Sequence, residues 1–433
     1  MSRIRIVVAL TLGAAMAVPA VASAGTYPPP SNPGAVQKAP KGPFHTLTVC
    51  KKGCKYKTIQ AAVRKAKAGD TVNVKRGVYR EAVSISGASK RYLKLVGNPK
   101  KPGDVVIEGT ISGSKRRQNG VIVNGADQVT INGFTARHYN GNGFFVTNVN
   151  GYRLTHLNAT LGGVYGIYAF NSIGGEMSDS QASYNNDGGF YIGQTPPQTK
   201  PKRSVVTRVK SFGNVLGFSG TNMRYVTITK SQWFNNGTGL VPNALDTEKY
   251  APPEDNVISD NDIFWNNFNY YAGAPFKLRT SSVGVPFPVG VGLLLFGGRR
   301  NEVSGNRIYG NYLVGVGALK QILLKQADAA DLIGNKVTNN AFGLGGADLN
   351  GRDLAYDGSG SDNCFAPNTG VAVTLPANGS TLAPCPFAGA NAFDGAAQLE
   401  ALGWAGDTTH EKNWIKHPHA PKTGYKPLEH YTK

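Results

Sequence analysis

The chain has 433 residues, of which 55 are glycine, and only 17% of its residues are charged. Lysine and arginine total 46 against 26 aspartates and glutamates, so the formal net charge is +20. This composition favours one elongated core with many tight corners and argues against several separate domains. The charge favours a polyanionic partner, although the same count also fits basic residues spread over a solvated surface.

Residues 1–24 have the pattern of a secretory signal peptide. Arg3 and Arg5 precede an apolar run, residues 6–20, and Ala22-Ser23-Ala24 has the small-x-small pattern of a cleavage site. The apolar run is short for a membrane span, and no other segment is long and apolar enough. We therefore expect a secreted or cell-envelope protein, cleaved near Ala24, that has no membrane span and does not bind nucleic acid.

Residues 25–57 form an N-terminal segment, rich in Pro and Gly at its start, that ends with the first of two cysteine pairs. Cys50 and Cys54 flank a Lys-Lys-Gly stretch there, and Cys364 and Cys385 close a loop near the other end. Four cysteines fit an oxidising compartment, so we expect two local disulfides, Cys50–Cys54 and Cys364–Cys385. A zinc site is the alternative, but it needs the two pairs brought together or histidines beside one pair.

The repeat region is expected to begin with a short amphipathic helix over residues 58–66, because Ile59, Ala62, Val63 and Ala66 share one face. Strands are expected after it at residues 71–74, 83–86, 93–96 and 105–107. A stack of strands has to cover its open end, since an exposed end invites aggregation. The helix is therefore predicted to be the N-terminal cap.

An aromatic residue followed by Asn or Gly and then Asn recurs at steps of about 22 residues, some lengthened by an insertion. The clearest copies are Tyr184-Asn185-Asn186, Phe212-Gly213-Asn214, Phe234-Asn235-Asn236, Trp265-Asn266-Asn267 and Tyr309-Gly310-Asn311. Short β-branched runs between the copies predict strands, and the Asn and Gly predict tight corners. The pattern predicts an all-β fold, a right-handed parallel β-helix over residues 58–350, with Asn side chains stacked at a corner.

The stretch from Thr58 to Ile85 closely resembles the N-terminal entry of secreted pectin-lyase-like β-helix proteins. The stretches Asn256–Asn267 and Asn301–Asn311 are similar to the generic right-handed β-helix repeats of that superfamily, including its NosD-like and carbohydrate-active members. The resemblance spans roughly residues 45–350 and implies the fold. It does not choose an activity, because the superfamily includes lyases, hydrolases, epimerases and adhesins.

Three Pro-containing insertions interrupt the repeats, at residues 195–203, 242–255 and 272–288. Inserted loops on one flank of a solenoid often line a binding face. The repeat fades after residue 350, so residues 351–433 are expected to form a C-terminal cap and a basic tail. That tail holds four of the seven histidines, but their spacing is too irregular to predict a metal site.

The motifs of known β-helix enzymes are absent. The chain lacks the Asn-Thr-Asp, Asp-Asp, Gly-His-Gly and Arg-Ile-Lys motifs of polygalacturonase-type hydrolases, and the Asp-Pro-His-Asp signature of mannuronan epimerases. The remaining catalytic candidates are Arg137, His138, Tyr139, Asp187 and Lys210. Here Arg137 would neutralise a uronate carboxylate while His138 or Tyr139 moves a proton. We expect no cofactor and no metal site; Ca²⁺ stays open, although no acidic cluster marks a site for it.

Four aromatic residues of the repeat are the candidate substrate-binding residues: Phe212, Phe234, Trp265 and Tyr309. Rings exposed in a row would form a platform for sugars, whereas buried rings would be part of the scaffold. We predict a monomeric, secreted β-helix protein that interacts with polysaccharide, an acidic one by the chain's charge. The alternatives are a uronic-acid lyase or epimerase and a structural protein of the cell surface or envelope.

Overall fold

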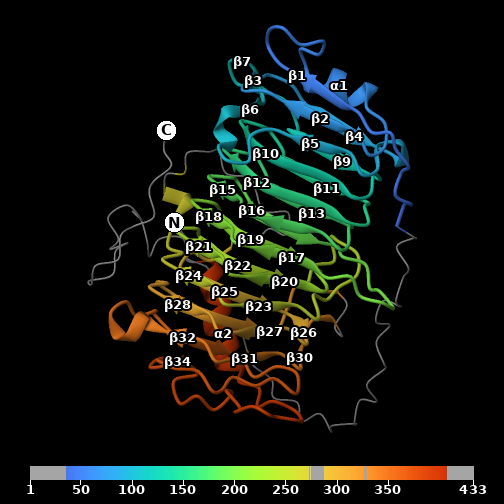
Figure 1. Ribbon diagram of the computed structural model, residues 1–433. Helices are drawn as coiled ribbons and strands as arrows, with labels where there is room; N and C mark the ends of the chain where they lie inside the picture. The colour runs from blue at the N-terminus through green and yellow to red at the C-terminus, as the bar shows by residue number, and fades with distance from the viewer. Residues whose placement is uncertain (1–35, 273, 275–286, 326–328, 407–433) are drawn as a thin grey trace, which may run out of the picture.

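The computed structural model describes residues 36–272, 274, 287–325 and 329–406 (Figure 1). The expected signal peptide and the four histidines of the tail, at positions 410, 417, 419 and 430, lie outside these residues. The described chain is a solenoid built on a 19-stranded and an 11-stranded sheet, whose strands pair in parallel from coil to coil. The predicted right-handed parallel β-helix is confirmed.

Each coil supplies three short strands, which form three columns. The first column contains β1 (Thr46–Val49), β2 (Thr71–Val74), β5 (Lys94–Val96), β14 (Glu176–Ser178), β17 (Ser204–Thr207), β20 (Val226–Thr229), β23 (Val257–Ser259), β27 (Glu302–Ser304) and β31 (Lys336–Thr338). The second contains β3 (Gly77–Tyr79), β6 (Val105–Glu108), β15 (Gln181–Ser183), β18 (Lys210–Phe212), β21 (Gln232–Phe234), β24 (Asp262–Phe264), β28 (Arg307–Tyr309) and β32 (Ala341–Phe342). Two longer strands, β10 (Val129–Arg137) and β12 (Tyr152–Thr160), pair with both columns and join them into the 19-stranded sheet.

The third column is the 11-stranded sheet. It contains β4 (Val83–Ser86), β9 (Val121–Asn124), β11 (Phe144–Thr147), β13 (Ile167–Phe170), β16 (Gly188–Gly193), β19 (Leu216–Thr221), β22 (Thr238–Asn243), β25 (Val291–Phe296), β29 (Val314–Leu319), β33 (Leu354–Tyr356) and β34 (Thr374–Leu375). Two small pairs lie outside the columns, β7 (Thr110–Ser112) with β8 (Lys115–Arg116) and β26 (Gly298–Arg299) with β30 (Leu332–Ile333).

Alternation along each strand sends every second side chain into the core. In the first column one inward position is occupied, coil after coil, by fully buried apolar residues: Ile131, Leu154, Met177, Val206, Ile228, Ile258, Val303 and Val337. Burying each such side chain stabilises the fold by about 2 kcal/mol. The core is thus a stack of identical layers, as expected for a solenoid.

Asparagine ladders hold the corners in register, as the sequence predicts. In the ladder before the third column, the Asn236 amide donates to the Asn266 carbonyl oxygen at 3.1 Å, and Asn266 donates to Asn311 at 3.0 Å. The side-chain oxygen of each Asn also accepts a hydrogen bond from the backbone N–H of the Asn one coil earlier. The three ladders contain Asn185, Asn214, Asn236, Asn266, Asn311 and Asn350; Asn256, Asn301, Asn335, Asn363 and Asn391; and Asn261, Asn306, Asn340 and Asn368.

The N-terminal end is covered as predicted, by α1 (Ile59–Lys65) (Figure 1). The Thr58 hydroxyl caps the helix by accepting the Ala61 N–H at 3.3 Å. The Glu81 carboxylate accepts the first two helical N–H groups, of Ile59 and Gln60, at 2.9 Å each. A carboxylate at this position also suits the helix dipole.

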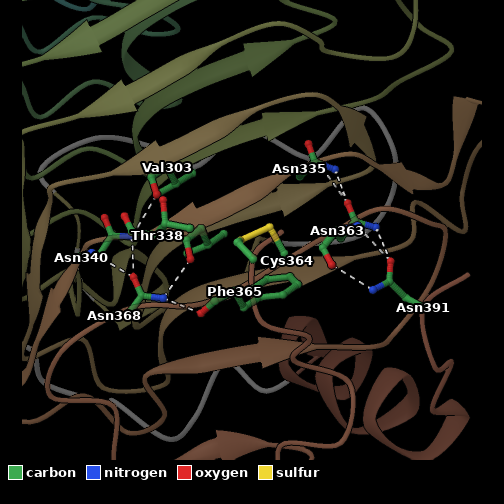
Figure 2. Close-up of a disulfide and its surroundings, with 11 residues drawn as sticks. Val303, Asn335, Thr338, Asn340, Asn363, Cys364, Phe365, Asn368 and Asn391 are labelled. Atoms are coloured by element: carbon green, nitrogen blue, oxygen red, sulfur yellow. Dashed lines mark hydrogen bonds between the residues drawn. A yellow bond between two sulfur atoms is a disulfide. The ribbon is translucent and has the colours of Figure 1, made fainter. Parts of the chain in front are cut away.

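The C-terminal end extends past the expected limit at residue 350, since β33 and β34 add two further strands to the third column. Figure 2 shows the Cys364–Cys385 disulfide between two Asn ladders of these last coils. The second predicted disulfide, Cys50–Cys54, is also present. The helix α2 (Gly395–Gly403) packs its buried Ala397 and Ala401 against the end of the 11-stranded sheet. No helix in the described part of the chain is both long and apolar enough to cross a membrane.

Candidate functional site

The structure brings two of the five predicted catalytic residues together, around a carboxylate that the sequence did not point to. Arg137 at the end of β10 donates to Glu108 at 2.8 Å, and the His138 ring lies 3.0 Å from the same carboxylate. Burial alone would raise the pKa of Glu108, but hydrogen bonds from Thr110, Arg137 and His138 lower it to about 2. Glu108 therefore already neutralises Arg137, which was assigned to a substrate carboxylate.

The other three predicted catalytic residues lie elsewhere. Tyr139 is fully buried, and its hydroxyl donates to the Glu81 carbonyl oxygen at 2.8 Å, so it has no access to a substrate. Lys210 begins β18 and lines an open groove beside Arg208 and Lys230. Asp187 precedes β16 and interacts electrostatically with Tyr168, Glu248 and Tyr270. The proposed five-residue constellation does not form.

The four aromatic rings predicted to form an exposed sugar platform are buried, so that prediction is wrong. The exposed fraction is 4% for Phe212, 3% for Phe234, 1% for Trp265 and 0% for Tyr309. Such rings have no free surface for a sugar. By the criterion set by the sequence, these four residues belong to the scaffold.

The members of the stack also differ from those expected. Phe264, and not Trp265, stacks between Phe234 and Tyr309, with ring centroids 5.1 and 5.0 Å apart. Trp265 lies one residue further on, with a φ of 50° that places it in the left-handed corner conformation. Tyr184 has the same corner conformation and meets Phe212 edge-on. A corner turns the side chain away from the direction it would have on the strand, so both residues leave the stack.

A different set of aromatic rings lies on the outer side of the 11-stranded sheet. Phe145, Tyr168 and Tyr191 stand at one register position on the successive strands β11, β13 and β16. Phe145 and Tyr168 stack with centroids 4.4 Å apart, and Tyr168 meets Tyr191 edge-on at 4.7 Å. Tyr165 contacts both tyrosines, at 4.7 and 4.6 Å. We call Phe145, Tyr165, Tyr168, Phe170 and Tyr191 the aromatic face.

Most of the aromatic face is accessible. Phe145, Tyr165, Tyr168 and Phe170 are partly exposed, whereas Tyr191 is buried. The strand neighbours Phe144, Ile167 and Phe190 point inward and are fully buried. This alternation was visible in the sequence, because each of the outer rings on a strand follows directly after an apolar core residue.

One insertion brings a carboxyl group to the aromatic face. Residues 244–255, which we call the Glu248 loop, follow β22, and Tyr191 donates its hydroxyl hydrogen to Glu248. The Asn222 amide donates to the carbonyl oxygens of Leu245, Glu248 and Lys249 at 2.8, 2.9 and 3.1 Å. The loop is thus fixed to a corner of the preceding coil.

A buried arginine ties the base of the Glu248 loop to a second insertion. The fully buried Arg224 donates to Glu254 at 2.6 Å and to the carbonyl oxygen of Tyr250 in the loop. It also donates to the carbonyl oxygen of Thr195 at 3.4 Å, at the start of the 195–203 insertion. Glu254 in turn accepts from Arg300 at 2.8 Å, so the buried charges form a paired network.

The electrostatics of the aromatic face favour protonated groups. Burial raises the pKa of Glu248 to about 7, helped by the nearby charge of Asp187 and opposed by the Tyr191 hydroxyl. Burial, together with the charges of Glu248 and Asp187, raises the pKa of Tyr168 well above its ordinary value. The Oε2 atom of Glu248 is buried and has no hydrogen-bond partner among the described residues. The site therefore presents ring edges, neutral hydroxyls and a carboxyl group that is half protonated near neutral pH.

The described residues contain no group of three or more His, Cys, Asp or Glu side chains that suits a metal ion. Asp187 and Glu248 are the two carboxyl groups nearest the aromatic face, and a pair of acids is fewer than the oxygen ligands Ca²⁺ requires.

No family model and no curated protein matches this chain. Among solved structures it is similar to the A-module of mannuronan C-5 epimerase AlgE4 from Azotobacter vinelandii, with 18% identity, a TM-score of 0.49, and coverage of 72% of this chain and 90% of that one. It is also similar to a rhamnogalacturonan lyase, with 14% identity, a TM-score of 0.41 and coverage of 76% and 84%. A third is pectate lyase Pel9A, with 13% identity, a TM-score of 0.42 and coverage of 77% and 78%. At these identities the likeness concerns the parallel β-helix fold alone.

Proposed function

We propose that this protein binds polysaccharide, and that the aromatic face is its contact surface. The observation that carries the proposal is the stacked pair of partly exposed rings, Phe145 and Tyr168, in register on β11 and β13, with the partly exposed Tyr165 beside Tyr168. A sugar presents C–H groups on one side and hydroxyls around its edge. Ring surface beside the tyrosine hydroxyls and the Glu248 carboxyl matches both, because aromatic side chains combine apolar area with a polar tip.

The coil spacing sets the direction of the bound chain. Strands of successive coils lie about 4.8 Å apart, which is roughly the length of one sugar unit. A chain running along the solenoid axis would therefore place neighbouring sugars on Phe145 and Tyr168, and the buried Tyr191 contacts the Tyr168 ring edge-on. The two disulfides support an oxidising compartment outside the cytosol, where such polymers occur.

The experiment is a screen of neutral and acidic oligosaccharides against the full chain and three variants. Tyr168→Ala is expected to weaken binding at least tenfold, while Tyr168→Phe, which keeps the ring, retains most of it. Phe393→Ala is the matched control, because Phe393 is a 58% exposed ring near the C-terminal helix. Binding that is equal in all four proteins, or no binding to any glycan, contradicts the proposal.

A uronic-acid lyase or epimerase is the second candidate, and one observation favours it. Glu248 is an acid whose pKa of about 7 suits proton transfer near neutral pH, and it lies beside Tyr191 and Asp187. In a lyase a base removes the C5 proton, the C4–O bond breaks, and the leaving oxygen takes a proton as the C4–C5 double bond forms. Absorbance of the unsaturated product with polyuronate substrates tests this. A product that forms equally with Glu248→Gln removes Glu248 from that role.

A further inference from the structure

A groove of about 420 Å³ lies at the N-terminal end of the second strand column, on the side of the solenoid where β3 and β10 end. Four cationic side chains line it: Lys51, Lys57, Arg80 and Arg137. We call it the basic groove. The Cys50–Cys54 disulfide closes the short loop that carries Lys51 and so fixes one wall of the groove.

The two acids beside this groove are already engaged within the protein. Glu81 uses both carboxylate oxygens on the first N–H groups of α1, each at 2.9 Å. The Glu108 carboxylate is hydrogen-bonded to Arg137, His138 and Thr110, at 2.8, 3.0 and 2.8 Å. Neither carboxylate makes an ion pair with Lys51, Lys57 or Arg80 among the described residues.

Four cations against Glu81 and Glu108 leave a net charge of +2 at the groove, and three of the cations have no acidic partner in the described part of the chain. Among the described residues, Lys51, Lys57 and Arg80 have no acidic side chain within 4.0 Å. The Lys51 ammonium group lies 4.2 Å from the centre of the Tyr79 ring, which holds it in place without neutralising it. By strand register Arg80 stands one coil before Glu108, and Arg137 stands one coil after it.

We propose that the basic groove binds carboxylate or sulfate groups of an acidic polysaccharide. An arginine and two lysines converging on one groove raise the local concentration of an anionic polymer, and the Arg80 guanidinium offers paired donors to a planar carboxylate. A polysaccharide is favoured over a nucleic acid because both disulfides indicate an oxidising compartment. The basic groove and the aromatic face lie on different strand columns, so this inference does not depend on the aromatic face.

The test measures binding of polygalacturonate, dextran sulfate, neutral dextran, duplex DNA and anionic phospholipid vesicles to the full chain. We expect polygalacturonate or dextran sulfate to bind, with an affinity that falls as salt is added, and neutral dextran not to bind through the groove. The double variant Lys57→Ala with Arg80→Ala should weaken polyanion binding at least tenfold. The aromatic-face variant Tyr168→Ala should weaken the glycan binding that persists at high salt, whereas the double variant removes the salt-dependent part, which separates the two sites.

The matched control is Lys100→Ala with Lys101→Ala, which removes the same charge from two exposed lysines outside the groove. An equal loss in the two double variants would show diffuse attraction to the +20 chain and would overturn the proposal. Tighter binding of DNA or vesicles than of either acidic glycan would overturn the choice of ligand. Circular dichroism of both variants confirms that a loss of binding is not a loss of fold.

Discussion

The substitution Glu248→Gln tests whether the aromatic face holds a buried, protonatable carboxyl group. Burial raises the pKa of Glu248 from an ordinary 4.5 to about 7. A pKa that is higher in the folded than in the unfolded chain stabilises the fold fully below pH 4.5. That stabilisation is lost as the pH rises to about 7, because the folded protein then has to hold a buried negative charge. The difference corresponds to about 3 kcal/mol of unfolding free energy.

Glutamine has nearly the same shape and still accepts the hydrogen bond from Tyr191, but it does not ionise. We therefore expect Glu248→Gln and the unaltered protein to have similar unfolding free energies at pH 4.5. At pH 8 the variant should be more stable by about 2 to 3 kcal/mol. Urea unfolding followed by tryptophan fluorescence measures this, since Trp233 and Trp265 are both buried.

Glu302→Gln serves as the control, because Glu302 is an exposed acid on β27 whose side chain accepts one hydrogen bond within the described chain, from the Ser304 hydroxyl at 3.0 Å. It should show no pH-dependent difference of this size. A gain in stability for Glu248→Gln that is the same at both pH values would mean that packing, and not charge, is responsible. A loss of stability at pH 8 would refute the raised pKa and, with it, the use of Glu248 as an acid near neutral pH.

Three further outcomes follow from the same contacts. Asn266→Ala removes a side chain that accepts from Asn236 at 3.1 and 3.3 Å and donates to Asn311 at 3.0 Å, and should lower the unfolding free energy by about 3 to 5 kcal/mol in urea titrations. Glu108→Gln should cost about 2 to 3 kcal/mol at pH 7, and the cost should vanish as the pH falls from 4.5 to 2, because Glu108 has a pKa of about 2 when folded and paired with Arg137. Replacing Cys364 and Cys385 by serine opens a loop with a sequence separation of 21 and should cost about 3 kcal/mol in thermal melts. An unchanged melting temperature for this last variant would contradict the view that the disulfide closes the C-terminal coils.

The fold was predictable because its signal repeats. The sequence of a single coil is too short to identify the fold. However, Asn recurs at each corner and alternating β-branched residues recur at each strand, so the repeated coils together identify it. The extent of the stack was less visible. After residue 350 the aromatic residue that precedes Asn in the repeat motif is missing. Asn363, Asn368 and Asn391 nevertheless continue the ladders.

The candidate site was harder to predict because it depends on the direction in which each side chain points. A ring one residue before or after a corner points to a different side, which is why Phe264 and not Trp265 enters the buried stack. The outer position of Tyr168 follows from strand alternation and could have been read from its neighbour Ile167. The place of Glu248 could not, because it depends on Asn222 and Arg224 holding a loop from another coil.

Each of the three Asn ladders described above has a polarity, because its interior side-chain amides donate to the Asn of the next coil toward the C-terminus. Such a column would end in a free donor and invite a second molecule to add its own coil. The last rungs prevent this by donating to other groups of the same chain: Asn350 donates to Asp353 at 3.0 Å, Asn391 to the Asn363 carbonyl oxygen at 3.0 Å, and Asn368 to the Phe365 carbonyl oxygen at 2.6 Å. Each chain of dipoles is thus terminated inside its own protein, so these side-chain amides are not left to bind an added coil.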